Sequence, residues 1–168
     1  MSRNTCAPKA LLAPLGALAL ISAATVTRST NSAAADPGLD ALAGAWRGGG
    51  TMSFESGKTE DISCNGYYKG AGKVSVVIRC KGTSSDFELR SKLSANGDKV
   101  SGSWEERTYN AAGVASGTTS PGRLNVQFSG SLTGRLEMSF SPSSQSVSVS
   151  VDTKGAGIAG VRVSLDRK

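Results

Sequence analysis

The sequence predicts an all-β protein, an antiparallel up-and-down β-barrel of about 8–10 strands that follows a short helical turn and a signal peptide. After Gly44, apolar residues recur at every second position in short runs, and Gly, Ser, Pro and Asn separate the runs. No later segment has helical spacing. Runs with one apolar and one polar face, joined by hairpins, indicate a closed barrel or a two-sheet sandwich. We favour the barrel because closure removes exposed strand edges.

Residues 1–35 have the three parts of a secretory signal peptide. Arg3 and Lys9 begin the segment, an apolar run extends to about Ala24, and Ala33-Ala34-Ala35 resembles a cleavage site. We expect cleavage after Ala35, with a cut after Ala24 as the alternative. A retained membrane anchor is disfavoured, because the run is shorter than the ~20 residues that span a bilayer. The sequence therefore predicts a periplasmic or secreted protein whose single domain is residues 36–168.

The charge of the predicted mature domain is modest. The whole chain has 19 basic and 13 acidic residues and a net charge of +6, but three of the basic residues and none of the acidic ones precede Asp36. The domain therefore carries 16 basic and 13 acidic residues, a net charge of about +3. No basic cluster stands out, so we expect no nucleic-acid partner.

The elements follow in order from the sequence pattern. Asp36 and Pro37 suit the start of a helical turn, with Leu39, Leu42 and Ala43 on its apolar side and its end at Gly44. Asn96-Gly97 and Ser120-Pro121-Gly122 indicate tight turns. The apolar residues expected on the strands are Trp46, Met52 and Phe54; Ile62, Cys64 and Tyr68; Val74, Val76, Ile78 and Cys80; Phe87, Leu89 and Leu93; Val100 and Trp104; Leu124, Val126 and Phe128; Leu136, Met138 and Phe140; Val147, Val149 and Val151; Val161, Val163 and Leu165.

Small residues make the strand assignment uncertain in one segment and allow two interpretations of the inner face. The segment from Tyr109 to Thr119 is rich in Gly and Ala and predicts a weaker pair of strand segments. Glycines at Gly48–Gly50 allow a sharp bend or a bulge inside a barrel strand. Gly66, Gly102, Ser116 and Thr118 are expected on the inner face, where strands crowd together or leave a cavity.

The apolar face of each strand is expected to point inward. The alternative is an outer-membrane barrel with this face turned outward. Aromatic residues make up only 5% of the chain, too few for two aromatic girdles. Several strands are also shorter than the ~9–11 residues that cross a bilayer. We therefore expect no transmembrane span in the mature chain.

Cys64 and Cys80 are expected to form a disulfide between neighbouring strands. If the strands pair about Gly72, Cys64 lies opposite Cys80, Gly66 opposite Ile78 and Tyr68 opposite Val76. Opposed Cα atoms at ~4.5 Å suit a disulfide, which an oxidising compartment would preserve. A redox-active pair is the alternative, but the spacing is not C-x-x-C. Cys6 precedes the apolar run and is expected to leave with the signal peptide.

Gly44-Ala45-Trp46 resembles the opening of the calycin proteins, which include lipocalins and avidins. In those families a G-x-W motif begins the first barrel strand after a short helical turn, and its tryptophan plugs the barrel base. The resemblance implies that Trp46 points inward at the base. Lipocalins also place a basic residue over this tryptophan from a late strand. Arg162 is the nearest candidate here, but its parity places it on the outer face.

The chain also looks like a group of small exported alphaproteobacterial proteins. These share a leading G-x-W, one cysteine pair and a Ser-rich final strand. This likeness implies the barrel architecture and carries no activity with it.

The residues present argue against catalysis. The chain has no histidine, which removes Ser-His-Asp and Cys-His mechanisms and most zinc sites. We expect no metal and no cofactor. Of the adjacent acids on strands, Glu60 and Glu106 would point inward near strand ends, where rim or solvent charges are the simpler interpretation. The sequence therefore predicts a protein that is not an enzyme.

Two functions remain open from the sequence. The first is a module that binds a small apolar ligand inside the barrel. Its expected lining is Trp46, Tyr68, Val76, Ile78, Phe87, Leu89 and Trp104. The second is a barrel with a filled core that interacts with a protein, such as an envelope protein, or has a structural role in the envelope. A secreted inhibitor is one example, and loops such as Tyr109 to Pro121 would make the contacts.

Overall fold

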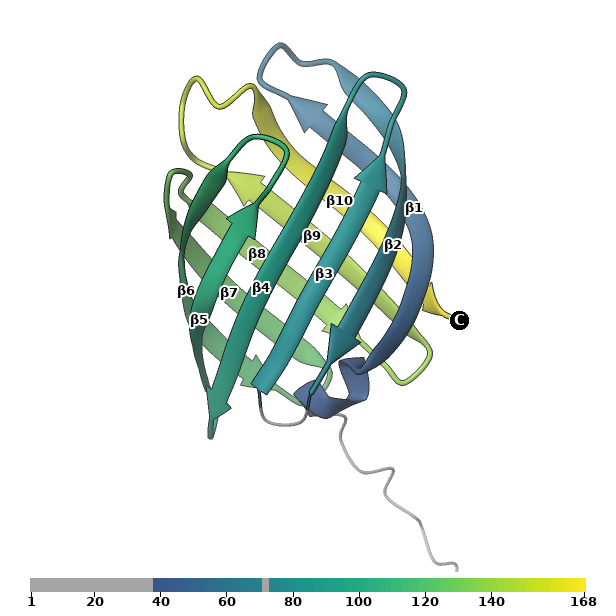
Figure 1. The fold of residues 1–168 in the computed structure, drawn as a ribbon, viewed down its shortest axis with the longest axis vertical. Coiled ribbons are helices and arrows are strands. Elements are labelled where there is room, and N and C mark those ends of the chain that lie inside the picture. The colour runs from purple at the N-terminus through teal and green to yellow at the C-terminus, as the bar shows by residue number, and fades with distance from the viewer. Residues whose placement is uncertain (1–37, 71–72) are drawn as a thin grey trace, which may run out of the picture. The chain divides into compact units, whose positions relative to one another are not determined.

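Ten antiparallel strands close into one barrel in the computed structural model, which describes residues 38–70 and 73–168 (Figure 1). The predicted signal peptide, Asp36 and Pro37 lie outside these ranges. The elements are η1 (Leu39–Leu42), β1 (Gly44–Phe54), β2 (Thr59–Lys69), β3 (Lys73–Lys81), β4 (Asp86–Asn96), β5 (Lys99–Glu106), β6 (Ala111–Ser120), β7 (Arg123–Gly130), β8 (Gly134–Phe140), β9 (Ser144–Val151) and β10 (Ile158–Arg167).

Strand order confirms the predicted up-and-down barrel. Each strand pairs with the next one along the chain, and β1 pairs with β10 to close the ring. The two ends of the barrel differ. One end, here called the mouth, is formed by loops 55–58, 82–85, 107–110, 131–133 and 152–157. The other, here called the base, carries η1 and the short turns between the remaining strands (Figure 1).

Apolar side chains point into the barrel, as the alternation predicted. On β3, for example, Val74, Val76, Ile78 and Cys80 are buried, while Lys73, Ser75, Arg79 and Lys81 between them are exposed. The alternative arrangement, with the apolar face turned outward, is not what the strands adopt. The described residues contain one helix, the four-residue turn η1, which is too short to cross a bilayer.

The predicted helical turn is the 3₁₀ turn η1, which follows Gly38 and lies across the base (Figure 1). Leu39 and Leu42 are both buried, at 6% and 2% exposure. They give the turn its apolar side and close the barrel at this end. The turn therefore covers the base of the barrel.

The prediction for the Gly/Ala-rich segment was wrong in two respects. Tyr109 to Thr119 does not form two segments or a long loop, because β6 runs unbroken from Ala111 to Ser120. Ser116 and Thr118 face outward, whereas Ala111 and Ala115 are buried. Small residues occupy both faces of this strand, so alternation of apolar and polar residues could not predict which face points inward. Pairing with β5 and β7 sets its orientation instead.

The glycines of β1 serve close strand approach and form no bulge. Pairing with β2 is unbroken from Gly44 to Ser53, and pairing with β10 shifts only between Ser53 and Phe54. A Cβ placed at Gly48 would lie 2.0 Å from the carbonyl oxygen of Ser164. Gly102 is similarly crowded, with Lys92 O at 1.9 Å from such an atom. These glycines mark crowding between strands, not space for a ligand.

The cysteine pair confirms the predicted register of β2 and β3. Cys64 lies opposite Cys80, and the two form a disulfide with their Cα atoms 4.1 Å apart. Gly66 faces Ile78 and Tyr68 faces Val76, as expected. The disulfide is fully inside the barrel, since Cys64 is 0% and Cys80 1% exposed. The covalent bond thus joins two neighbouring strands from their inner faces.

Candidate ligand cavity

The barrel encloses a cavity of about 420 Å³. Six of the seven residues predicted to line the interior do so. They are Tyr68, Val76, Ile78, Phe87, Leu89 and Trp104. The wall also reaches Tyr109, which is 55% exposed, and exposed Asn110, so the cavity meets the surface at the mouth. The interior is therefore not the filled core that the alternative function required.

Trp46 points inward at the base, as the resemblance implied, but it does not belong to the cavity wall where the sequence also placed it. It is fully buried in the base, where its indole N–H donates a 2.8 Å hydrogen bond to the carbonyl oxygen of Leu42 in η1. Its ring meets Tyr68 edge-on, with the centroids 6.2 Å apart. Alternation placed Trp46 on the correct face, but alternation does not say how far along the barrel axis a residue lies.

Arg167 covers Trp46 from the end of β10, a role that was not predicted from the sequence. Its Cζ lies 4.4 Å from the centroid of the Trp46 ring, and the two residues are partners across β1 and β10. Its guanidinium also donates to the backbone carbonyl oxygens of Ala41, Ala43 and Pro142. Arg162, the candidate from the sequence, lies on the outer face opposite Thr51 of β1, whereas Arg167, although exposed at the strand end, lies opposite Trp46.

The signal for Arg167 was present in the sequence. Arg167 has the same parity as the buried Val163 and Leu165, so alternation along β10 already placed it inward. Cation–π contact and hydrogen bonds to the turn and to the loop after β8 then join both ends of the described chain at the base. The base of the barrel is therefore firmly closed.

A buried polar pair lies between the cavity and the base. The Tyr68 hydroxyl donates a 3.0 Å hydrogen bond to Oε1 of Gln145 on β9. Burial raises the pKa of this hydroxyl well above its usual value, so it remains a donor. Gln145 is 3% exposed, and its Nε2 has no partner among the described residues. Gln145 itself is not part of the cavity wall.

Two other polar wall residues also have partners. The indole N–H of Trp104 donates to the carbonyl oxygen of Ser129 at 3.3 Å, and its ring stacks edge-on against Phe128 with centroids 5.6 Å apart. The Ser91 hydroxyl donates to the carbonyl oxygen of Ser103 at 3.0 Å. The polar side-chain atoms of Tyr68, Ser91 and Trp104 are therefore already paired within the barrel, and the polar residues Glu106, Tyr109, Asn110 and Ser131 of the wall lie at the mouth or next to it.

Three glutamates at the mouth each hold a neighbouring loop. Glu106 accepts the backbone N–H groups of Thr108 and Tyr109 at 3.1 and 2.6 Å, and that of Glu88 at 2.8 Å. Glu60 accepts both the N–H and the hydroxyl of Ser84, and its pKa is lowered chiefly by the Ser84 N–H. Glu55 accepts the N–H groups of Gly155 and Gly157.

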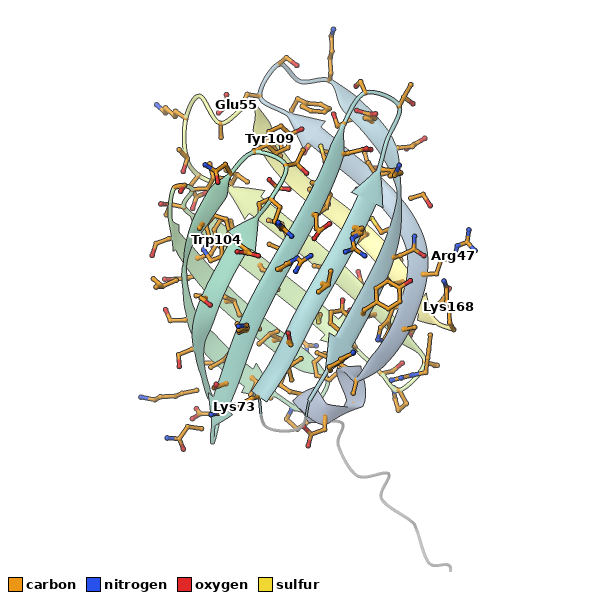
Figure 2. The ribbon with its side chains drawn as sticks, viewed as in Figure 1. Arg47, Glu55, Lys73, Trp104, Tyr109 and Lys168 are labelled. Atoms are coloured by element: carbon orange, nitrogen blue, oxygen red, sulfur yellow. A yellow bond between two sulfur atoms is a disulfide. The ribbon has the colours of Figure 1, made fainter. Side chains whose placement is uncertain are left out.

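Glu60 and Glu106 are therefore more than solvent-exposed rim charges, because their carboxylates order the loops around the entrance. The loop that Glu106 holds ends at Asn110, which has a φ of +53°. That left-handed conformation is uncommon for a residue other than glycine, and asparagine tolerates it better than most. Figure 2 shows Glu55 and Tyr109 at this end and Lys73 at the other.

Replacing Glu106 with alanine is expected to loosen the loop 107–110. The amide groups of Thr108 and Tyr109 lose their acceptor, so their hydrogen exchange should rise by roughly tenfold or more. Glu105→Ala is the matched control, because Glu105 is the preceding residue on β5 and its side chain is 54% exposed on the outer face. Equal exchange in the two variants would show that Glu106 does not hold the loop.

One cluster of charges on the outer face, around Glu88, is paired. Glu88 on β4 lies 2.8 Å from Arg79 Nε and 2.6 Å from Arg90 Nη2, and Arg107 approaches it to 4.0 Å. Hydrogen bonds from Arg79 and then Arg90 lower the pKa of Glu88 to about 2. Arg107, next to the mouth, is thus directed to the outer face.

The barrel is similar in fold to two natural proteins of known structure. Rv2717c from M. tuberculosis matches with a TM-score of 0.64 and 10% sequence identity, over 77% of this chain and 94% of that chain. The S-type phycobiliprotein lyase CPES from Guillardia theta matches with a TM-score of 0.57 and 10% identity, over 77% of this chain and 89% of that one. At this identity the likeness concerns the fold alone.

A redesigned β-barrel, mFAP1, bound to DFHBI, matches less well, with a TM-score of 0.42 and 10% identity over 77% of this chain and 96% of that chain. No family model and no curated protein matches the sequence.

The described wall of the cavity carries few ionisable groups. Among the described residues that line it, Glu106 is the one acidic or basic side chain, and three backbone N–H groups already occupy its oxygens. In residues 38–70 and 73–168, no three His, Cys, Asp or Glu side chains gather to hold a metal ion. What the arrangement provides is an apolar space with an ordered entrance.

Proposed function

We propose that this chain is an exported binding protein that holds a small apolar ligand inside a calycin-like barrel and catalyses no reaction. The observation that carries the proposal is the cavity of about 420 Å³, closed at the base and reaching the surface at the mouth. Binding sites for small molecules are typically apolar cavities of ~300–1,000 Å³ with a few polar groups.

Export is supported by two independent features. Residues 1–35 have the arrangement of a signal peptide, and the Cys64–Cys80 disulfide suits an oxidising compartment. The proposal places the protein in the periplasm or outside the cell, where an apolar molecule needs a carrier or a receptor to remain in water.

Absence of catalysis is supported by the state of the polar groups. A two-carboxylate mechanism needs a second acid facing the same space, and Glu106 has none in the described wall. The hydroxyl of Tyr68 is held by Gln145 and is kept protonated by burial.

Filling the cavity tests the proposal. Ala115 lines the cavity and is 6% exposed, while its neighbour on β6, Val114, is 63% exposed on the outer face. Ala115→Phe is expected to weaken binding of the apolar fluorophore N-phenylnaphthylamine by about tenfold or more, because the new ring occupies space that the ligand needs. Val114→Phe adds the same ring outside the barrel and should leave the affinity unchanged.

Fluorescence titration of the wild type and both variants gives the answer. Far-UV circular dichroism and thermal unfolding show whether each variant is folded. A wild type that does not bind the fluorophore, or an Ala115→Phe variant that binds as tightly as the wild type, would contradict a ligand site in this cavity.

A further inference from the structure

The wall of the cavity carries no positive charge. Its described residues include no Lys or Arg, and Glu106, at the mouth, is the one charged side chain among them. The nearest basic residue on the adjoining loop, Arg107, is directed toward Glu88 on the outer face. A ligand with a negative group therefore finds no counter-charge along the wall.

The polar atoms of the inner wall cannot replace that counter-charge. The Tyr68 hydroxyl donates to Gln145, the Trp104 indole to Ser129, and the Ser91 hydroxyl to Ser103. The unpaired Nε2 of Gln145 belongs to a residue outside the wall, on the base side of Tyr68. No free donor among the described wall residues thus faces the inner part of the space.

The carboxylate of Glu106 at the mouth also repels a negatively charged ligand. An acid that kept its charged group in water would have to place it at the entrance, where Glu106 is the one charged residue of the described wall. Like charges at close range disfavour such a position, and burial of an unpaired anion is costly. An uncharged molecule of the same size pays neither cost.

We propose, on the basis of the proposed function, that this cavity selects uncharged apolar molecules and rejects organic acids of the same shape. The selectivity arises from Glu106 at the mouth and from the paired polar atoms of the wall. Fatty acids and other amphiphilic anions are therefore poor ligands, and neutral hydrocarbon or aromatic molecules are the class that the site takes.

Two matched fluorophores test this selectivity on the folded, oxidised protein. N-phenylnaphthylamine is neutral, and anilinonaphthalene sulfonate has the same ring system with one added sulfonate. The neutral probe is expected to bind about tenfold or more tightly. Ala115→Phe identifies binding in the cavity, because it should weaken only molecules that bind there.

The outcomes separate the two proposals. If neither probe binds in a manner sensitive to Ala115→Phe, the ligand site itself is wrong. If both bind there with equal affinity, or the sulfonate binds more tightly, the ligand site stands and the selectivity is wrong. Glu106→Gln removes the charge while retaining an acceptor oxygen, so the ratio of the two dissociation constants should fall toward one. An unchanged ratio would overturn the role of Glu106.

Discussion

Replacement of Trp46 by alanine is expected to lower the free energy of unfolding by about 3–5 kcal/mol, as large-to-small changes at fully buried aromatic residues do. Trp46 is 0% exposed. Its removal leaves a void beneath Tyr68, deprives the Leu42 carbonyl oxygen of its donor, and takes away the ring under Arg167. The domain has a total stability of ~5–15 kcal/mol, so this is a large part of it.

Trp104→Ala provides the matched control. Trp104 is also buried and also makes one indole hydrogen bond, but it lines the existing cavity. Its truncation enlarges a space that is already open, so fewer packing contacts are lost and the destabilisation should be smaller. Urea unfolding of both variants, followed by circular dichroism, measures the difference. A loss in Trp104→Ala that equals or exceeds that of Trp46→Ala would show that the base is not the tightly packed end.

The register of the cysteine hairpin could be predicted because two independent requirements coincide there. Alternation placed Cys64 and Cys80 on the apolar face, and pairing about Gly72 placed them opposite one another. Few registers satisfy both conditions, since a slip of one residue turns every side chain to the other face. The same reasoning succeeds wherever apolar and polar residues alternate, as on β3.

The orientation of β6 could not be predicted, because its sequence does not distinguish two faces. Ala111 and Ala115 face inward while Val114, larger and more apolar, is 63% exposed. Burial at this strand is decided by its neighbours, whose parity is fixed by residues such as Trp104 and Phe128. The local sequence of such a strand does not predict which face is buried, because pairing with the neighbouring strands determines it.

The sequence pattern could not predict whether the barrel contains a cavity. Alternation states which residues face inward, and six of the seven expected lining residues do line the space. Whether inward side chains meet at the centre depends on the circumference of the ring, and hence on the number and tilt of its strands. The position of Trp46 along the axis depends on η1 and Arg167, which close one end.

Loss of the Cys64–Cys80 disulfide is expected to lower stability by about 3 kcal/mol. The cysteines are separated by 16 residues in the sequence, and the chain-entropy model assigns about this free energy to a loop of such a size. For a domain of this length the melting temperature should fall by roughly 10 °C. Cys64→Ser should show this loss and keep its far-UV β signal, because the ten-strand ladder does not depend on the covalent bond.

Reduction of the wild-type protein separates the bond from the side chains. A reductant breaks the disulfide and leaves both sulfur atoms in place, so the reduced wild type should lose most of the stability that Cys64→Ser loses. The variant itself should not respond to the reductant. Thiol labelling of the oxidised wild type should find neither Cys64 nor Cys80 free. Two reactive thiols, or reduction without a fall in melting temperature, would show that the inner faces of β2 and β3 are held by packing alone.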